Sequence, residues 1–304
     1  MAFGEENLND VVANAFALLE EGRYETAISM LTPVAQSPSA DKAIRGRAWT
    51  VLGFAYKQDG QFEQARRCYE QALRIFNEAE IFDSDRAAAL DFFGNLELDM
   101  GNLADGLRLL TEALQIDEKL QDQERLSTVH AHLAGIAIQQ KHYKDAKKYL
   151  ESSEQEANSV PDVKPKLLAD IYGTRGWLAT ATGKKREAVE EYERSLEACK
   201  HQFGNQHPLT GWAYLLLGKA IADDGNVEDG MKSIRDGLAI LEATSGTQDL
   251  RYLAGEIAYS KLLDRSGAHA ESAWLATEAK QEIDSRMRSH CSNCTVSVWS
   301  FQQK

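Results

Sequence analysis

The residue types best suited to metal or redox chemistry lie in the stretch "SHCSNC", which contains His290, Cys291 and Cys294. Cys-x-x-Cys beside a histidine is one half of a common zinc-site pattern. A structural zinc site needs four ligands, however, and no second cluster of Cys and His lies nearby in the sequence. The order also differs from the Cys-x-x-Cys-His of haem attachment. We therefore expect a reduced, unligated segment, with a redox pair as the alternative.

The histidines offer little else for catalysis. His130 and His132 are two residues apart, so on a helix they point to different faces and do not readily share an ion. His142 lies at an expected turn and His207 precedes Pro208, where each is more typical of a solvated or capping residue. No phosphate loop, nucleophile elbow or dinucleotide fingerprint is present. We predict no catalytic residue, no metal and no cofactor, and hence no enzyme.

The stretch "AWTVLGFAYKQDGQFEQARRCYEQAL" (48–73) mixes aromatic, small and charged residues in an order that repeats along the chain. Its landmarks Trp49, Leu52, Gly53 and Tyr56 are spaced by three and four residues, as on one face of a helix, and Gly60 marks the following turn. Equivalent patterns begin near residues 8, 46, 87, 127, 169, 211 and 253, at steps of 38 to 42 residues. Because this pattern recurs along the chain, we interpret its residues as packing positions and not as a catalytic site. Single cysteines inside these patterns, Cys68 and Cys199, fit small core residues.

The pattern resembles the tetratricopeptide repeat, and its 38–42-residue units resemble the extended repeats of kinesin light chain and related bacterial proteins. "QFGNQHPLTGWAYLLLGKA" (202–220) is similar to the linker of that group. The resemblance implies an all-α, right-handed superhelical solenoid of about seven helix-turn-helix units with a concave groove lined by first helices. We expect an N-terminal extension (1–7), the solenoid (8–286) and a C-terminal tail (287–304).

The resemblance also implies which side chains face the groove, because in that family they occupy fixed motif positions between the packing residues. The positions carried over to this chain are Arg47, Thr50, Phe54, Lys57, Asp91, Asn95, His132, Gln139, Trp177, Trp212 and Lys219. Trp177 and Trp212 are the expected anchors for a partner side chain, with packing against a long second helix as the alternative. Arg175 replaces a usual Leu and needs a carboxylate, for which Asp170 and Glu190 are the expected candidates.

Two binding modes known in the family are not supported by the residues at the sixth motif position. The carboxylate clamp of chaperone co-factors needs Asn and Arg there, and kinesin light chain has Asn. Here the position holds Ala13, Val51, Phe92, His132, Thr174, Leu216 and Ala258. We therefore expect a more apolar groove than in either relative.

The charge balance narrows the class of partner. A formal net charge of -13 disfavours non-specific binding to nucleic acid or to anionic membranes, since both need a cationic surface. The chain has no run of 18 apolar residues, so we expect no membrane span. The N-terminus lacks the pattern of a secretory signal. We therefore expect a cytoplasmic protein. The predicted function is a non-catalytic scaffold that binds a protein or peptide segment. The alternative is a peptide-sensing regulator acting through a separate effector chain.

The end of the chain has a different pattern. After Asp284 we expect the helical period to stop, and "TVSVWSF" (295–301) alternates as a strand does. We expect this tail to fold back into the groove or to cover the last unit, because the end of a solenoid needs a cap. Addition to a partner sheet, self-association through the tail and a mobile end are the alternatives.

Overall fold

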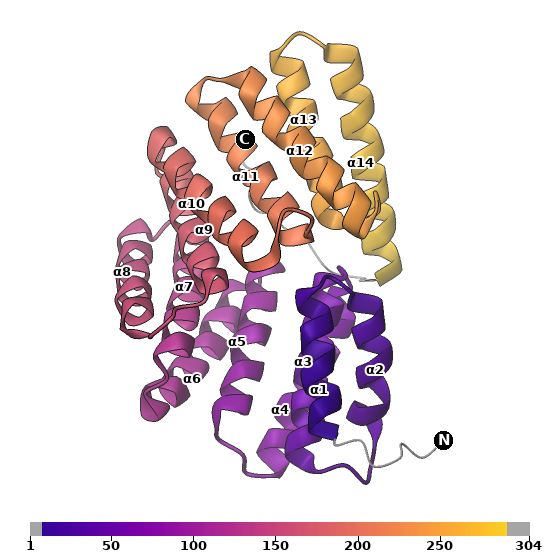
Figure 1. Ribbon diagram of the computed structural model, residues 1–304, viewed down its shortest axis with the longest axis vertical. Coiled ribbons are helices and arrows are strands. Elements are labelled where there is room, and N and C mark those ends of the chain that lie inside the picture. Colours follow the sequence, from indigo (N-terminus) through magenta and orange to yellow (C-terminus); the bar gives the residue numbers. More distant parts are fainter. Residues whose placement is uncertain (1–7, 291–304) are drawn as a thin grey trace. The chain divides into compact units, whose positions relative to one another are not determined.

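The computed structural model describes residues 8–290, and every regular element in that range is an α-helix (Figure 1). The chain divides into two compact units, with the sequence boundary between Asp122 and Gln123. The first unit contains α1 (Leu8–Glu20), α2 (Tyr24–Gln36), α3 (Lys42–Gln58), α4 (Phe62–Glu78), α5 (Ser84–Asp99) and α6 (Leu103–Leu120). The second contains α7 (Gln123–Gln139), α8 (Tyr143–Ser159), α9 (Pro165–Ala181), α10 (Lys185–Phe203), α11 (Pro208–Asp224), α12 (Val227–Ser245), α13 (Leu250–Arg265) and α14 (His269–His290).

The helices pack as successive hairpins. Each odd-numbered helix, here called an A helix, packs on the even-numbered B helix that follows it, and each B helix within a unit packs on the next A helix. Neighbouring A helices also touch, as α1 with α3, α3 with α5, α7 with α9 and α11 with α13. The prediction of an all-α, helix-turn-helix solenoid of seven pairs is confirmed for the described residues.

The turn inside each pair requires a left-handed backbone conformation. Gly22, Gly60, Gly101, Gly183, Gly225 and Gly267 all have positive φ at this position. After α3, the Gly60 N–H donates to the Lys57 carbonyl and the Gln61 N–H donates to the Tyr56 carbonyl, which satisfies the last carbonyls of the helix. The fourth pair has Lys141 instead, with φ 61°. A side chain in this conformation is strained, and glycine is not.

A close helix crossing explains the small residues of the repeat. A Cβ on Gly53 would lie 2.7 Å from the Tyr69 ring, and a Cβ on Gly176 would lie 2.8 Å from the Tyr192 ring. Both glycines lie on A helices, and both aromatic residues lie 16 positions later on the B helix. The interpretation of Gly53 as a packing residue is confirmed, because a methyl group has no room there.

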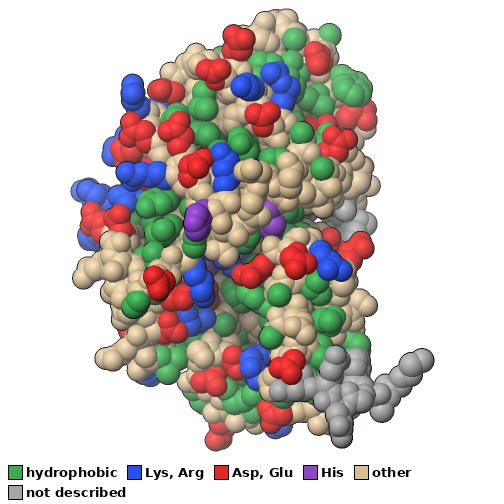
Figure 2. All heavy atoms as spheres, viewed as in Figure 1, with side chains coloured by type: hydrophobic (Ala, Val, Ile, Leu, Met, Phe, Trp, Pro, Cys, Tyr) green, Lys and Arg blue, Asp and Glu red, His purple; other side chains and the backbone are tan. Residues whose placement is uncertain are grey.

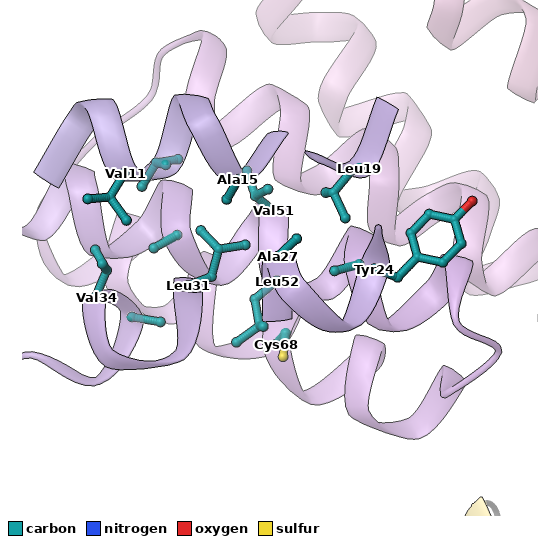
Figure 3. Packing of buried hydrophobic residues seen from close by; sticks show 14 residues of the cluster. Val11, Ala15, Leu19, Tyr24, Ala27, Leu31, Val34, Val51, Leu52 and Cys68 are labelled. Atoms are coloured by element: carbon teal, nitrogen blue, oxygen red, sulfur yellow. The ribbon is translucent and has the colours of Figure 1, made fainter. Parts of the chain in front are cut away.

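The cores lie between helices of consecutive pairs and not within one pair alone. Figure 3 shows side chains of α1, α2, α3 and α4 meeting in one cluster, in which Ala15, Leu31 and Leu52 are buried. Cys68 belongs to this cluster, and burial raises the pKa of its thiol to about 12. Cys199 is buried in a second cluster, and burial, with a smaller contribution from Asp170, raises its pKa to about 12 also. Both cysteines therefore serve as small core residues.

The last helix differs from the sequence expectation. We expected the helical period to stop after Asp284, but α14 continues to His290. Arg286, Met287 and Arg288 are good helix formers, so the end of the apolar spacing need not end the helix. The strand-like segment 295–301 and the thiols of Cys291 and Cys294 lie outside the described residues.

Candidate functional site

The A helices α3 and α11 are enclosed by their neighbours except along a narrow stripe. On α3, the residues at 46, 48, 50–53 and 55 are buried, while Arg47, Phe54 and Lys57 are partly exposed. On α11, Trp212, Leu216, Lys219 and Asp223 form a stripe of partly exposed side chains with the spacing of one helix face. These stripes are the places where an A helix can present side chains to another molecule.

In the first unit, the stripes of three A helices are joined by polar contacts near their N-terminal ends. The Arg47 Nη2 donates to Asn9 Oδ1 on α1 at 2.5 Å. The Nε of the same side chain lies 3.2 Å from Asp85 Oδ2 on α5. Arg47 therefore bridges both neighbouring helices, and its charge is balanced within the protein.

A second polar connection lies near the other end of the same stripes. Lys57 Nζ lies 2.8 Å from Asp99 Oδ2 and also donates to the Asn95 Oδ1. The Lys57 side chain is only 12% exposed, so its charge is engaged by the acceptors of α5. Three predicted groove residues, Arg47, Lys57 and Asn95, are thus brought into one face of this unit, where they hold the A helices together.

Between these two connections lies a row of aromatic rings. Phe16 on α1 stacks on Phe54 on α3 with ring centroids 6.3 Å apart, and Phe54 packs on Phe92 on α5 at 5.2 Å. All three side chains are partly exposed. The three residues, here called the phenylalanine row, form an apolar strip bordered by polar side chains on the A helices of the first unit.

Two predicted groove residues of this unit have no accessible side chain. Thr50 is 4% exposed, and its hydroxyl donates to the Gly46 carbonyl within α3. Asp91 is 2% exposed and lies near the Tyr69 hydroxyl, whose pKa is raised chiefly by burial and further by neighbouring charges that include Asp91. Their place in the groove stays a prediction, and in this structure adjacent helices cover both side chains.

In the second unit, the two predicted tryptophan anchors pack into helix interfaces. Trp177 lies against a cluster on α7 and α8 that includes Ile138 and Tyr149. Trp212 lies against a cluster of α11, α12 and α13 that includes Leu215. Both are only partly exposed. Both rings therefore make the packing contacts of the alternative that the sequence left open, as Phe16 and Phe54 do in the first unit.

The other predicted groove residues of the second unit are partly exposed on A helices. His132 and Gln139 lie on α7, and Lys219 lies on α11. Lys219 Nζ lies 3.1 Å from Asp223 Oδ2 one turn along the same helix. Nothing in the structure brings His132 and Gln139 into contact with Lys219.

Arg175 finds carboxylates other than those expected. Its Nη1 lies 2.9 Å from Glu154 Oε1 on α8, and its Nε lies 3.6 Å from Glu191 Oε1 on α10. Glu190, by contrast, lies 3.5 Å from Arg186 on its own helix. Burial raises the pKa of Glu191, and the positive charge of Arg175 opposes that shift. The expected need for a carboxylate is confirmed, but the partners are wrong because Glu191 and not Glu190 faces α9.

His207 has the capping role that its position before Pro208 suggested. The side chain is buried, its Nδ1 accepts a hydrogen bond from the Leu209 N–H, and its ring stacks on Phe203. Within residues 8–290, no group of three or more His, Cys, Asp or Glu side chains is placed to hold a metal ion. None of the helices in that range combines the length and apolar character needed to span a bilayer.

The surface carries both signs of charge. On the face shown in Figure 2, acidic and basic side chains are interspersed. Many of the pairs lie three or four residues apart on one helix, such as Lys147 with Glu151 and Arg186 with Glu190. Such exposed pairs contribute little to stability.

Comparison with known proteins agrees with the repeat pattern. Two models of the tetratricopeptide repeat match the chain, at residues 46–79 and 169–202. These ranges cover most of α3 with α4, and most of α9 with α10. The chain is a tetratricopeptide-repeat protein. No curated protein sequence matches it.

Solved structures with the same tetratricopeptide fold share little sequence with the chain. The Rap conjugation gene regulator of plasmid pLS20, in complex with the Phr* peptide, has a TM-score of 0.70 and 16% identity over 93% of this chain and 75% of its own. A Rap protein complexed with competence and sporulation factor has a TM-score of 0.59 and 13% identity over 93% and 99%. BtubC (BKLC) from P. vanneervenii has a TM-score of 0.51 and 19% identity over 80% and 94%. At such identities the likeness concerns the fold.

Sequence reasoning missed two of the three members of the phenylalanine row. Phe16 and Phe92 were not among the predicted groove residues, although Phe54 was. The available signal was their spacing, since residues 16, 54 and 92 are separated by 38 positions in both steps. Phe92 was named only at the sixth motif position, whereas Phe16 and Phe54 are at the ninth, so motif numbering did not group the three residues.

Proposed function

We propose that this tetratricopeptide-repeat protein is a non-catalytic scaffold that binds a peptide or protein segment along its A helices. The phenylalanine row carries the proposal. It offers three rings from three helices as one apolar strip, and large aromatic side chains dominate binding energy at protein interfaces.

The surroundings of the row favour binding over catalysis. Arg47 and Lys57 border it, and both are engaged by acceptors of neighbouring helices. These cations hold the wall in one shape and add no reactive group to it. A rigid apolar strip with a polar border is the usual anatomy of a recognition surface.

Similar structures support a peptide as the bound segment. Two of them are Rap proteins, one determined in complex with the Phr* peptide and the other complexed with competence and sporulation factor. The structural similarity to Rap proteins also favours a second candidate function. In it the chain is a peptide-sensing regulator that acts through a separate effector chain. Small-angle scattering distinguishes the two, because a sensor changes its pitch when the segment binds and a rigid scaffold does not.

The test of the proposed function is affinity capture with quantitative mass spectrometry, comparing the full chain with the Phe54→Leu/Phe92→Leu variant. Leucine keeps most of the apolar volume, so the fold survives, but the ring contacts are lost. We expect capture of the specific partner to fall about tenfold or more, since truncation of a hot-spot side chain costs about 2 kcal/mol or more and leucine retains part of the ring's apolar contact.

The matched control is Phe82→Leu. Phe82 is a highly exposed phenylalanine between α4 and α5, where its ring lies 4.7 Å from the Arg86 guanidinium. The control should capture the partner as the unaltered chain does. Equal capture by all three proteins would exclude the phenylalanine row as the binding surface.

A further inference from the structure

The last helix of the described chain, α14 (Figure 1), carries an exposed tryptophan where the other B helices carry a polar residue. Trp274 is 63% exposed and lies two residues after Ser272, which is small and buried. Every B helix has a buried small residue at this place, and the residue two positions later is exposed. In chain order these exposed residues are Ser29, Arg67, Arg108, Lys148, Glu190, Lys232 and Trp274. Exposure of Trp274 is therefore a property of its repeat position and does not arise only because α14 is the last helix.

The residues that border Trp274 on one side of the helix are also uncharged. Ala270, Ala273 and Thr277 lie four before, one before and three after it, and all three are exposed. The Thr277 hydroxyl donates to the Ala273 carbonyl at 2.7 Å, so its hydrogen bond is made within α14. The four residues, here called the tryptophan patch, therefore form an exposed helix face that is mainly apolar.

The other six B helices each carry at least one charged side chain at the same four positions. Examples, one from each of α2, α4, α6, α8, α10 and α12, are Glu25, Glu63, Arg108, Lys148, Glu190 and Lys232. Charged side chains suit a face that stays in water. A large aromatic ring among small uncharged residues is stabilised instead when another apolar group covers it.

The segment 295–301, "TVSVWSF", matches the tryptophan patch in chemistry. It contains no charged residue, and its large apolar side chains are Val296, Val298, Trp299 and Phe301. A segment without charge can cover an uncharged helix face and leave no ion buried without a partner. The segment lies outside the described residues and is separated from the end of α14 only by residues 291–294.

The length of chain after α14 is sufficient to reach the patch. Trp274 lies 16 residues before His290, which is about 24 Å along the helix at about 1.5 Å per residue. An extended chain advances about 3.3 Å per residue, so about seven residues return over that distance. Eleven residues lead from His290 to Phe301, which leaves about four for the reversal of direction. Residues 291–294 supply those four, and the segment 295–301 supplies the seven.

We propose that the tryptophan patch is a docking surface for the segment 295–301 of the same chain, which folds back along α14 and packs its apolar side chains on Trp274. The inference goes beyond the proposed function, because it concerns a contact within the second unit and does not involve the phenylalanine row. A docked segment removes the Trp274 ring from water and keeps the patch from pairing with a second copy of the chain.

The experiment is limited proteolysis of the full chain with chymotrypsin, which cleaves after aromatic residues such as Trp299, followed by mass spectrometry. The variant is Trp274→Lys, and lysine occupies the equivalent position on α8 and α12, so the helix tolerates it. We expect cleavage after Trp299 to become about tenfold faster or more, because the rate follows the undocked population and burial of a large apolar side chain shifts that population at least this far. The matched control is Phe82→Lys, which removes a similarly exposed aromatic residue from the first unit and should leave the rate unchanged.

Equal rates of cleavage in the three proteins would overturn the proposal. Protection that grows with protein concentration would overturn it too, since the patch would then hold the segment of a second copy. A second measurement places the photo-crosslinker benzoylphenylalanine at position 274, where it keeps an aromatic ring, or at position 232 on α12 as the control. We expect crosslinks within one chain from position 274 to the segment 295–301 and none from position 232. Absence of the first crosslink would contradict the docking.

Discussion

At the scale of single residues, small side chains decide how closely the two helices of a pair approach. The same crossing recurs in four pairs, with a glycine on the A helix and a large residue 16 positions later on the B helix. The pairs of residues are Gly53 with Tyr69, Gly94 with Leu110, Gly176 with Tyr192, and Gly218 with Ile234. Since the interior is close-packed, a methyl group at such a site must displace its neighbours.

The first prediction concerns Gly53→Ala. Its new Cβ would lie 2.7 Å from the ring of a fully buried tyrosine, so we expect a loss of about 1–3 kcal/mol in the free energy of unfolding. The matched control is Gly173→Ala on α9, where the nearest atom would be at an ordinary 3.4 Å. There the higher helix propensity of alanine should leave stability unchanged or raise it by up to about 1 kcal/mol. Urea unfolding measures the change in the free energy of unfolding for both variants. Equal changes would contradict the steric argument.

At the scale of the elements, the turn between A and B helices sets where each helix stops. Glycine supplies the left-handed conformation in six pairs, and Lys141 adopts it in the fourth. The starts of the helices are also specified by local signals. The carboxylates of Asp41 and Asp83 accept hydrogen bonds from backbone N–H groups in the first turns of α3 and α5. Such signals act over a few residues and are readable in the sequence.

The second prediction is that Lys141→Gly stabilises the protein by about 0.5–1 kcal/mol. The gain from removing a strained left-handed side chain exceeds the cost of the more flexible unfolded chain. The reciprocal change, Gly183→Ala, should destabilise by about 1 kcal/mol. An added Cβ there meets no atom within 4 Å, so any loss arises from the backbone conformation. Thermal or urea unfolding of the two variants tests this, and a destabilised Lys141→Gly protein would refute it.

At the scale of the whole molecule, substantial packing joins only helices that are adjacent or next but one along the described chain. A protein built this way is close to one-dimensional, so a local loss of stability has a limited range. The chain also forms two compact units. Both features indicate that the two candidate binding surfaces respond separately to substitution.

The third prediction uses Gly53→Ala in amide hydrogen exchange followed by mass spectrometry. Exchange should become faster in peptides from α1 to α6, because the substitution weakens packing there. Peptides from α11 to α14 should exchange as in the unaltered chain. A uniform increase over the whole chain would show a single cooperative unit instead.

The sequence by itself determined the repeats, the turns and the packing positions, because periodic apolar residues, glycines and caps act over short distances. Tertiary structure decided which side chains stay accessible. Thr50 and Asp91 are covered, Trp177 and Trp212 pack into helix interfaces, and Phe16 and Phe92 join Phe54 in one row. Exposure at these positions depends on helices 30 to 40 residues away and on their register, and motif numbering within one repeat does not contain that information.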